Sequence, residues 1–437
     1  MLKVLKFGGS SLSDAAQFKK VADIIKAEKE RKYIVASAPG KRFDNDTKVT
    51  DMLLDCFDKS YETEYTEKCF AQITERFNNI IEGLGLNFSL EEDFNYIKSS
   101  LKHHAGRDYF ASRGEYLNAK ILAEYLGYPF IDASVCIFFN EDGTLNSEKT
   151  NNILGEILEK YEYAVLPGFY GSMPNGTIKT FSRGGSDITG SIVARAAKAD
   201  VYENWTDVSG LLMVDPRIVE NPKTVKEITY RELRELSYMG ATVLHEEAIF
   251  PVKKAGIPIN IRNTNAPADK GTFIVPKATT ESSENVITGV AGLAGFTAIF
   301  IEKAMMNAEV GFTRRVLETL ENHNLCFEHL PSGIDTMSIV LRSDAIKELK
   351  GVITADIVKK VEPDSITLFE NLALIAVVGR GMISNRGTAA KVFTALADAN
   401  INIRMIDQGS SELNIIIGVE EKDLKDAIRV IYNKFVG

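Results

Sequence analysis

KVLKFGGSS, residues 3–11, predicts a buried strand that runs into a tight turn led by two glycines. A helix should follow, because apolar residues then recur at helical spacing, at Phe18, Val21, Ala22 and Ile25. Glycines at the end of a strand let backbone amides approach a ligand, and the N-terminus of the next helix favours anions. Lys6 adds a positive charge at this place. The stretch therefore indicates either a phosphate site or a tight turn with a solvated lysine.

Outward from this stretch, short β-branched runs alternate with amphipathic helical segments through about residue 275. The further predicted strands lie at 33–37, 129–132, 163–166, 178–181, 201–205 and 257–262. Residues 51–127 and 187–197 are predicted to be mainly helical. Strands that alternate with helices form mainly parallel sheets covered on both faces. The first part of the chain is therefore predicted to be α/β.

Length and composition narrow the class of protein. The chain has 437 residues, which at roughly 150 residues per domain suggests about three domains. Its 45% hydrophobic and 25% charged residues are ordinary for a globular protein and exclude wholesale disorder. The net charge of −9 argues against nucleic acid or an anionic membrane as a partner, because both attract a cationic surface. Four scattered cysteines, no leader segment and no long apolar span predict a reduced, cytoplasmic protein.

The last part of the sequence contains an internal repeat at an offset of 76 residues (387 − 311). Gly311 aligns with Gly387, and flanking apolar positions align too, as Val316 does with Val392. Each copy predicts a strand, a glycine-led turn, an amphipathic helix and two more strands, so two related α+β units are expected. A polar segment at 278–284 is the predicted linker before them.

Two more polar segments follow predicted strands. FSRGGSD at 181–187 contains an arginine, two glycines, hydroxyls and a carboxylate within a few residues. A structural loop does not need so many functional groups so close together. WTDVSG at 205–210, followed by DPR at 215–217, suits a nucleotide but is also common turn chemistry. The sequence has no P-loop, no dinucleotide fingerprint and no protein-kinase motif, so any nucleotide should bind in another kind of site. His245 is interpreted as a structural residue.

Taken in order, these segments resemble the aspartate kinases, members of the amino acid kinase family that carry C-terminal ACT domains. The resemblance runs nearly end to end and rests on KFGGSS at 6–11, SAP at 37–39, SRGE at 112–115, GF at 168–169, SRGGSD at 182–187, WTDV at 205–208 and DPR at 215–217. It implies an amino-acid kinase catalytic domain over 1–280, with a mainly parallel central sheet between helices. It also implies two α+β, ferredoxin-like ACT regulatory domains over 295–370 and 371–437. A strand from about 286–301 is a candidate to complete the second of these.

The resemblance implies a kinase that uses ATP and Mg²⁺ to phosphorylate the β-carboxylate of L-aspartate, the first step toward lysine, threonine and methionine. Lys6 at the phosphates, and Asp187 orienting both Lys6 and magnesium, are the implied catalytic residues. The implied substrate contacts are Ser37, Thr50, Glu115, Phe169, Arg183 and Ser186. Among these, Arg183 would pair with the α-carboxylate of aspartate and Glu115 with its α-amino group. The implied ATP contacts are Gly8, Gly9, Ser10, Thr206, Asp207 and Arg217, and no direct protein ligand of the metal is predicted.

The chemistry of the reaction agrees with these residue types. A β-carboxylate with an ordinary pKa of about 3.9 is already ionised at neutral pH, so no general base is needed. Positioning and cations then supply most of the rate enhancement. Two alternatives stay open: a kinase for another amino-acid carboxylate or for carbamate, and an amino-acid-sensing protein whose kinase domain is inactive. The sequence departs from the family pattern in three places. Thr242 stands where a lysine is common and Leu212 where a tyrosine is common, and both departures concern the nucleotide contacts. An insertion at 42–48 weakens the assignment of Thr50 to the substrate pocket.

ACT domains imply feedback by an end-product amino acid, here lysine, threonine or both. The implied effector residues are Met306, Gly311, Phe312, Glu328 and Asp335. The two carboxylates could meet the ammonium group of lysine, or they could be ordinary solvated surface groups. ACT units usually pair across subunits, which predicts a homodimer or a dimer of dimers.

Overall fold

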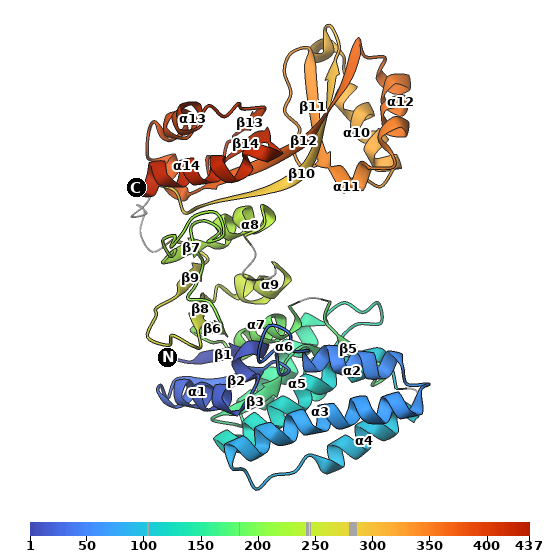
Figure 1. The fold of residues 1–437 in the computed structure, drawn as a ribbon, viewed down its shortest axis with the longest axis vertical. Coiled ribbons are helices and arrows are strands. Elements are labelled where there is room, and N and C mark those ends of the chain that lie inside the picture. The colour runs from blue at the N-terminus through green and yellow to red at the C-terminus, as the bar shows by residue number, and fades with distance from the viewer. Residues whose placement is uncertain (103–104, 183, 242–243, 245, 279–285) are drawn as a thin grey trace. The chain divides into compact units, whose positions relative to one another are not determined.

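The computed structural model describes residues 1–102, 105–182, 184–241, 244, 246–278 and 286–437, which form two compact units (Figure 1). Unit 1 comprises Met1–Leu211, Thr224–Tyr230 and Val243–Ala278. Unit 2 comprises Leu212–Lys223, Arg231–Thr242 and Thr279–Gly437. Three residues that the sequence singled out lie outside the described residues: Arg183, Thr242 and His245.

The centre of unit 1 is a mostly parallel sheet with the strand order β3-β2-β1-β6-β8-β9-β7. The strands of unit 1 are β1 (Lys3–Phe7), β2 (Arg31–Ala36), β3 (Ala164–Pro167), β4 (Tyr170–Ser172), β5 (Ile178–Thr180), β6 (Val201–Thr206), β7 (Glu227–Thr229), β8 (Ile259–Asn263) and β9 (Thr272–Val275). Neighbouring strands in this sheet are parallel except β8 and β9, which are antiparallel. The predicted mainly parallel sheet is confirmed.

Helices cover both faces of this sheet. They are η1 (Gly9–Leu12), α1 (Ala15–Lys26), α2 (Val49–Asp58), α3 (Thr63–Leu84), α4 (Glu91–Lys102), α5 (Arg107–Leu126), η2 (Ala133–Val135), α6 (Ser147–Leu158), α7 (Gly185–Ala196) and α9 (Glu246–Ala255). α7 contacts β1, β2 and β6 with α6 and α9 beside it, whereas α5 contacts β2 and β3 with α1, α2 and α3 beside it. Side chains alternate along a strand, so Leu5 and Phe7 enter the core with α1, α3 and α5, while Lys6 faces α7.

Two of the predicted strands take other places. Residues 129–132 form only an isolated bridge, from Phe130 to Val165. The reason is that Asp132 caps η2, accepting a hydrogen bond from Ser134 N–H at 2.9 Å, and so turns the chain. β5 pairs with β4 in a separate antiparallel hairpin. The strand predicted at 129–132 was therefore wrong, and the one predicted at 178–181 does not join the central sheet.

Unit 2 is built on an antiparallel sheet with the strand order β11-β10-β12-β14-β13. Its long strands β10 (Gly289–Glu302) and β12 (Ser365–Val378) run through the whole unit side by side (Figure 1). The shorter strands are β11 (Thr336–Arg342), β13 (Met405–Asp407) and β14 (Asn414–Glu420). β11 pairs with residues 296–302 of β10, and β14 pairs with residues 372–378 of β12. The opposite halves of β10 and β12 therefore belong to different repeats.

Two helices of unit 2 mark the sequence repeat. α10 (Phe312–Asn322) and α13 (Thr388–Asp398) begin and end at matching positions of the two copies. Each follows a glycine with a positive φ, 81° at Gly311 and 83° at Gly387, which glycine adopts without steric cost. The remaining helices are α8 (Tyr230–Tyr238), η3 (Met306–Ala308), α11 (Ser343–Ile346), α12 (Lys350–Val361), η4 (Arg380–Ile383), η5 (Glu421–Asp423) and α14 (Leu424–Val436). α12 packs beside α10 and α14 beside α13, so each repeat covers the sheet with a helix pair.

Two segments that precede residue 280 belong to unit 2. Val290 N–H donates to the carbonyl of Met213 at 2.7 Å, which attaches residues 212–223 to β10. Glu232 of α8 accepts a hydrogen bond from the Thr288 hydroxyl at 2.6 Å, which attaches residues 231–241 to the same strand end. The predicted domain boundaries, 1–280, 295–370 and 371–437, stay a prediction.

Three further observations concern the described residues as a whole. None of their helices is long and apolar enough to cross a membrane. No group of three or more His, Cys, Asp or Glu side chains among them could hold a metal ion. All four cysteines are free; Cys56, Cys69 and Cys136 are buried and Cys326 is exposed.

Candidate active site

The centre of the candidate site is a buried ion pair between β1 and α7. Lys6 Nζ lies 2.6 Å from Asp187 Oδ1, and the two side chains are 9% and 17% exposed. Asn204 of β6 donates to the same oxygen at 2.8 Å. β6 neighbours β1 in the sheet, and α7 covers both strands, so the fold brings these residues together from three distant parts of the chain. The structure thus unites the two predicted catalytic residues, Lys6 and Asp187.

The glycine loop, defined here as Gly8, Gly9 and Ser10, follows directly after Lys6. Gly8 N–H donates to the carbonyl of Trp205 at 3.0 Å, which ties the loop to the end of β6. A Cβ at Gly8 would lie 3.7 Å from Lys6 Nζ, so the position of the missing side chain faces the lysine ammonium. A Cβ at Gly9 would lie 2.9 Å from the carbonyl oxygen of Ala38, a distance that real Cβ contacts do not reach. A methyl group at Gly8 would therefore fit in contact with the lysine, whereas Gly9 is required for the close packing of two backbones.

Glu115 of α5 lies in the interior of unit 1 and is 6% exposed. Burial raises the pKa of this carboxyl to about 8, although the Ala38 N–H and the charges of Arg113 and Lys6 favour the ionised form. Its Oε2 has no hydrogen-bond partner in the described part of the chain. A buried carboxylate oxygen without a partner is costly, and a cationic ligand would satisfy it.

Ser37 and Thr50 lie near Glu115. Ser37 N–H donates to the carbonyl of Phe7 at 3.2 Å, which places this residue at the end of β1. Thr50 is on the first turn of α2, and a Cβ at Gly114 would lie 3.6 Å from its hydroxyl oxygen. The structure thus places Thr50 next to the residue before Glu115, in spite of the insertion at 42–48.

The GF segment packs directly onto the N-terminus of α7. Phe169 has a φ of 79°, in the left-handed region, and its N–H donates to the Thr189 hydroxyl at 3.0 Å. A Cβ at Gly168 would lie 2.7 Å from the Ser186 hydroxyl, and a Cβ at Gly185 would lie 2.3 Å from the Phe169 ring. The two glycines are therefore required for the contact that brings Phe169 together with Ser186, which is three residues from Arg183 in sequence.

Thr206 and Asp207 lie where β6 ends, beside the glycine loop. The Thr206 hydroxyl is 3.1 Å from Asp207 Oδ1. The carbonyl of Thr206 accepts a hydrogen bond from Thr264 N–H at 2.9 Å, and the Thr264 hydroxyl is 2.8 Å from that of Ser11. This chain of contacts connects the predicted nucleotide residues of β6 to the glycine-led turn.

Arg217 is the one described ATP-contact candidate that belongs to unit 2. Its side chain is 88% exposed and lies 2.6 Å from Asp215. The hydrogen bonds of Arg217 lower the pKa of the Asp215 carboxyl. Inside its own unit, Arg217 therefore holds the turn of the DPR segment, and its role toward ATP stays a prediction.

The sequence did not point to two buried asparagines of the site. Asn204 holds Asp187, as described above. Asn118 of α5 donates to the carbonyl of Ser37 at 2.7 Å, and its Oδ1 has no partner among the described residues. Both lie inside segments that read as an ordinary strand and an ordinary helix. The only sequence signal for them is an asparagine at a position that the strand or helix pattern predicts to face the core.

The five predicted effector residues lie in the first repeat of unit 2. Met306 and Phe312 are buried in its core, and Gly311 precedes α10. Asp335 is exposed and accepts a hydrogen bond from Met305 N–H at 2.8 Å. Glu328 accepts one from the Tyr238 hydroxyl. Both carboxylates thus already have a donor.

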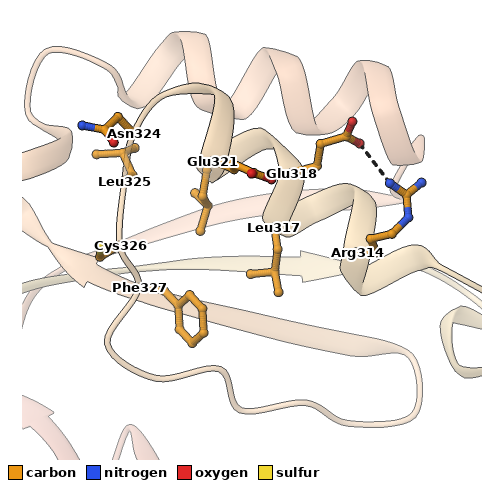
Figure 2. A pocket seen from close by; sticks show the side chains of 9 residues that line it. Arg314, Leu317, Glu318, Glu321, Asn324, Leu325, Cys326 and Phe327 are labelled. Atoms are coloured by element: carbon orange, nitrogen blue, oxygen red, sulfur yellow. Dashed lines mark ion pairs between the residues drawn. The ribbon is translucent and has the colours of Figure 1, made fainter.

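A cavity of about 1020 Å³ lies against α10 in the same repeat. Figure 2 shows Leu317 and Glu321 of α10 lining it on one side, with Phe327 extending toward Leu317. Arg314 and Glu318, which also line it, form an ion pair at 3.6 Å along the helix. None of the five predicted effector residues is among the nine described residues that line this cavity.

Comparison with known proteins gives matches to both parts of the chain. The model of the amino acid kinase family matches residues 1–263, and an ACT domain model matches residues 375–435. Aspartokinase 3 of Bacillus subtilis (strain 168) is 40% identical over 455 aligned residues, which cover 99% of this chain and 98% of that protein. The crystal structure of Clostridium acetobutylicum aspartate kinase superposes with a TM-score of 0.93 at 52% identity, covering 99% of this chain and 100% of the other. E. coli aspartokinase III has the same fold, with a TM-score of 0.73 at 22% identity and 99% of each chain covered.

Proposed function

The chain belongs to the amino acid kinase family, as one of its aspartokinases, and we propose that its Lys6 site transfers the γ-phosphoryl group of ATP to the β-carboxylate of L-aspartate. The observation that carries the proposal is the buried Lys6–Asp187 pair beside Gly8 of the glycine loop. An ammonium at the end of a glycine loop, in a site shielded from water, stabilises the negative charge that spreads over the transferring group.

The reaction needs no proton acceptor from the protein. A β-carboxylate oxygen of aspartate attacks the γ-phosphorus, the bond from this phosphorus to the β,γ-bridging oxygen breaks, and ADP leaves with that electron pair. The products are 4-phospho-L-aspartate and ADP. Because the nucleophile is ionised before it reacts, the protein must supply positioning and positive charge. Lys6 supplies the charge, and Asp187 together with Asn204 fixes where it lies.

Glu115 supports an amino acid as the acceptor. Its buried Oε2, which has no hydrogen-bond partner among the described residues, suits the α-ammonium group of the substrate. The positive charge of that group would stabilise the ionised carboxylate, which burial alone disfavours. Arg183, three residues before Ser186 in sequence, is proposed to bind the α-carboxylate. Ser37 and Thr50 would line the rest of the substrate pocket.

ATP and magnesium complete the proposed site. Mg²⁺ usually keeps several waters and binds substrate phosphates, and Asp187, which holds Lys6, would orient the ion at those phosphates. When bound, the ion would neutralise phosphate charge. Gly8, Gly9 and Ser10 would bind phosphates through their backbone, and Thr206, Asp207 and Arg217 would contact the rest of the nucleotide. E. coli aspartokinase III has been solved with aspartate and ADP, the ligand classes that we propose here.

Unit 2 is proposed to regulate the kinase by binding lysine, threonine or both. E. coli aspartokinase III has also been solved with lysine and aspartate. Met306, Gly311, Phe312, Glu328 and Asp335 are the proposed effector contacts. We further propose that ACT domains pair two or four chains, and that the enzyme begins the lysine, threonine and methionine route in the cytoplasm.

The proposal is tested by measuring ADP release with aspartate, glutamate, acetylglutamate and carbamate as separate acceptors. We expect turnover with aspartate and background rates with the others. Turnover with another acceptor and none with aspartate would replace the proposed substrate. Lysine binding without turnover on any acceptor would instead support the alternative of an amino-acid-sensing protein.

A further inference from the structure

The insertion at 42–48 lies in a loop, residues 39–49, beside the glycine loop of unit 1. Val49 N–H donates to the carbonyl of Pro39 at 3.2 Å, so the two ends of the 39–49 loop meet. Gly40, which precedes the insertion in this loop, donates its N–H to the carbonyl of Gly9 at 2.8 Å. A Cβ at Gly40 would lie 2.5 Å from the carbonyl carbon of Gly9. The backbone of the 39–49 loop is therefore in direct contact with the glycine loop at Gly40.

A buried arginine connects the glycine-led turn with the neighbouring loop. Arg76 of α3 is 5% exposed. One end of its guanidinium group donates to the carbonyl of Gly40 at 2.6 Å and to that of Ser13 at 3.3 Å. Ser13 ends the glycine-led turn and Gly40 lies in the 39–49 loop just before the insertion, so a single side chain fixes the turn and the loop against each other.

The insertion itself provides the counter-charge of this arginine. Arg76 Nη1 lies 2.8 Å from Asp46 Oδ2, and the Asp46 side chain is 9% exposed. Hydrogen bonds from Arg42, together with the charge of Arg76, hold the pKa of the Asp46 carboxyl well below its usual range. Asp46 is therefore ionised at neutral pH. A buried guanidinium without a carboxylate would be strongly disfavoured, so the insertion makes the buried Arg76 possible.

We propose that Arg76 and Asp46 act as a latch that positions the glycine loop for the phosphates of ATP. Arg76 is a positioning residue in this account, because it reaches the loop through Gly40 and Ser13 and does not contact the reacting atoms. The inference rests on the proposed assignment of Gly8, Gly9 and Ser10 to ATP. It gives the insertion a task in nucleotide binding.

The test compares Arg76→Met, Arg76→Lys and Asp46→Asn with wild type. Calorimetry gives the dissociation constant of ADP, and steady-state kinetics give the KM values for ATP and aspartate. For Arg76→Met we expect about a tenfold weaker affinity for ADP and a similar rise in the KM for ATP, with the KM for aspartate changed less than about twofold. Arg76→Lys should recover part of the loss, and Asp46→Asn should shift the same constants in the same direction by less.

A control separates positioning from stability. Lys120→Met removes a part-buried ion pair with Asp93, 2.6 Å long, elsewhere in unit 1. It should leave the nucleotide constants unchanged, whatever it does to the melting temperature. If Arg76→Met does not fold, Arg76→Lys and Asp46→Asn carry the test.

The outcomes distinguish the latch from the proposed function. Variants that melt earlier but bind ADP as wild type does would overturn the latch, and so would equal changes in the two KM values. If wild type binds ADP without phosphorylating aspartate, the proposed function fails, while weaker ADP binding by the variants would still support the latch. A wild-type protein that binds no ADP would overturn both.

Discussion

Lys6 Nζ lies 2.6 Å from Asp187 Oδ1, between a strand and a helix that are about 180 residues apart in sequence. The pair is nearly buried, and Asn204 fixes the carboxylate from a third element. The ion pair fixes the position of the lysine ammonium group, and Gly8 lies beside it. The site thus has a preorganised cation where phosphate is proposed to bind.

Removal of the Lys6 ammonium should abolish most of the turnover. We expect Lys6→Met to lower kcat by about 10²–10³-fold, because a preorganised donor to the developing charge is lost. Lys3→Met is the matched control, since Lys3 is also buried on β1 but faces the other side and pairs with Glu203 at 3.2 Å. It should lower stability and spare kcat. Equal kcat losses in the two variants, both folded by circular dichroism, would contradict the role of Lys6.

The two adjacent glycines of the loop should respond differently to the same substitution. Gly8→Ala fits the backbone, because φ is −70° and the nearest atoms to a Cβ lie at 3.6 and 3.7 Å. Its methyl group would occupy the space at Lys6 Nζ, so we expect a higher KM for ATP with a normal melting temperature. Gly9→Ala collides with Ala38 and should lower the free energy of unfolding by about 1–3 kcal/mol. Urea denaturation and ATP kinetics on both variants check this; a stable Gly9→Ala protein would refute the packing argument.

The ionisation of Glu115 should appear in the pH profile of aspartate binding. Burial raises the pKa of Glu115 to about 8 in the protein without ligand, and only the ionised form pairs with the α-ammonium group. We therefore expect kcat/KM for aspartate to rise from about pH 6.5 to about 8.5, because this ratio reports groups of the free enzyme. Glu115→Gln should raise the KM and flatten the rise. A profile with the same rise in Glu115→Gln would assign it to another group.

The same carboxyl should make stability depend on pH. Its pKa is about 8 in the folded state and near the ordinary 4.5 in the unfolded state, so between these values the folded state binds more protons. The free energy of unfolding then falls as pH rises through this range. We therefore compare the melting temperature of Glu115→Gln with that of wild type at two pH values. The variant should be more stable relative to wild type at about pH 8.5 than at about pH 5.5. A difference that stays constant or reverses would show that Glu115 is ionised in the folded protein.

Effector control is checked by titrating lysine and threonine, separately and together, into the kinase assay. We expect at least one of them to inhibit. Asp335→Asn should then require a higher effector concentration, because an exposed carboxylate is lost from the proposed ammonium contact. Leu317→Ala, in the separate cavity of Figure 2, is the control that should leave the response unchanged. Flat activity in all titrations would refute feedback by either amino acid.

Periodicity predicted much of the fold, and its failures have local causes. The 76-residue offset of the sequence repeat predicted matching helices in the two copies. α10 and α13 do match, and each begins directly after a glycine with positive φ. The segment 129–132 has the composition of a strand, but the cap formed by Asp132 ends it. Unit 2 also includes residues 212–223, where Met213 accepts a hydrogen bond from Val290 of β10. No local sequence pattern indicates this distant contact.

The site was predictable where a motif names residues that are adjacent in sequence. Lys6, Glu115 and Asp187 were named from such motifs, and the structure places them in unit 1 around the end of β1. Asn204 and Arg76 were missed because their roles depend on partners that are 17 and 36 residues away. Arg76 looks like any arginine on an amphipathic helix until the carbonyls that it reaches are known.

The central claim is that the Lys6 site makes an acyl phosphate on the β-carboxylate of aspartate. The most direct measurement traps this product with hydroxylamine, in the presence of ATP, Mg²⁺ and aspartate, and identifies the hydroxamate by mass spectrometry. The account predicts aspartyl β-hydroxamate from wild type, equal to the ADP released, and only a trace from Lys6→Met. No hydroxamate from wild type, or the same yield from both proteins, would contradict it.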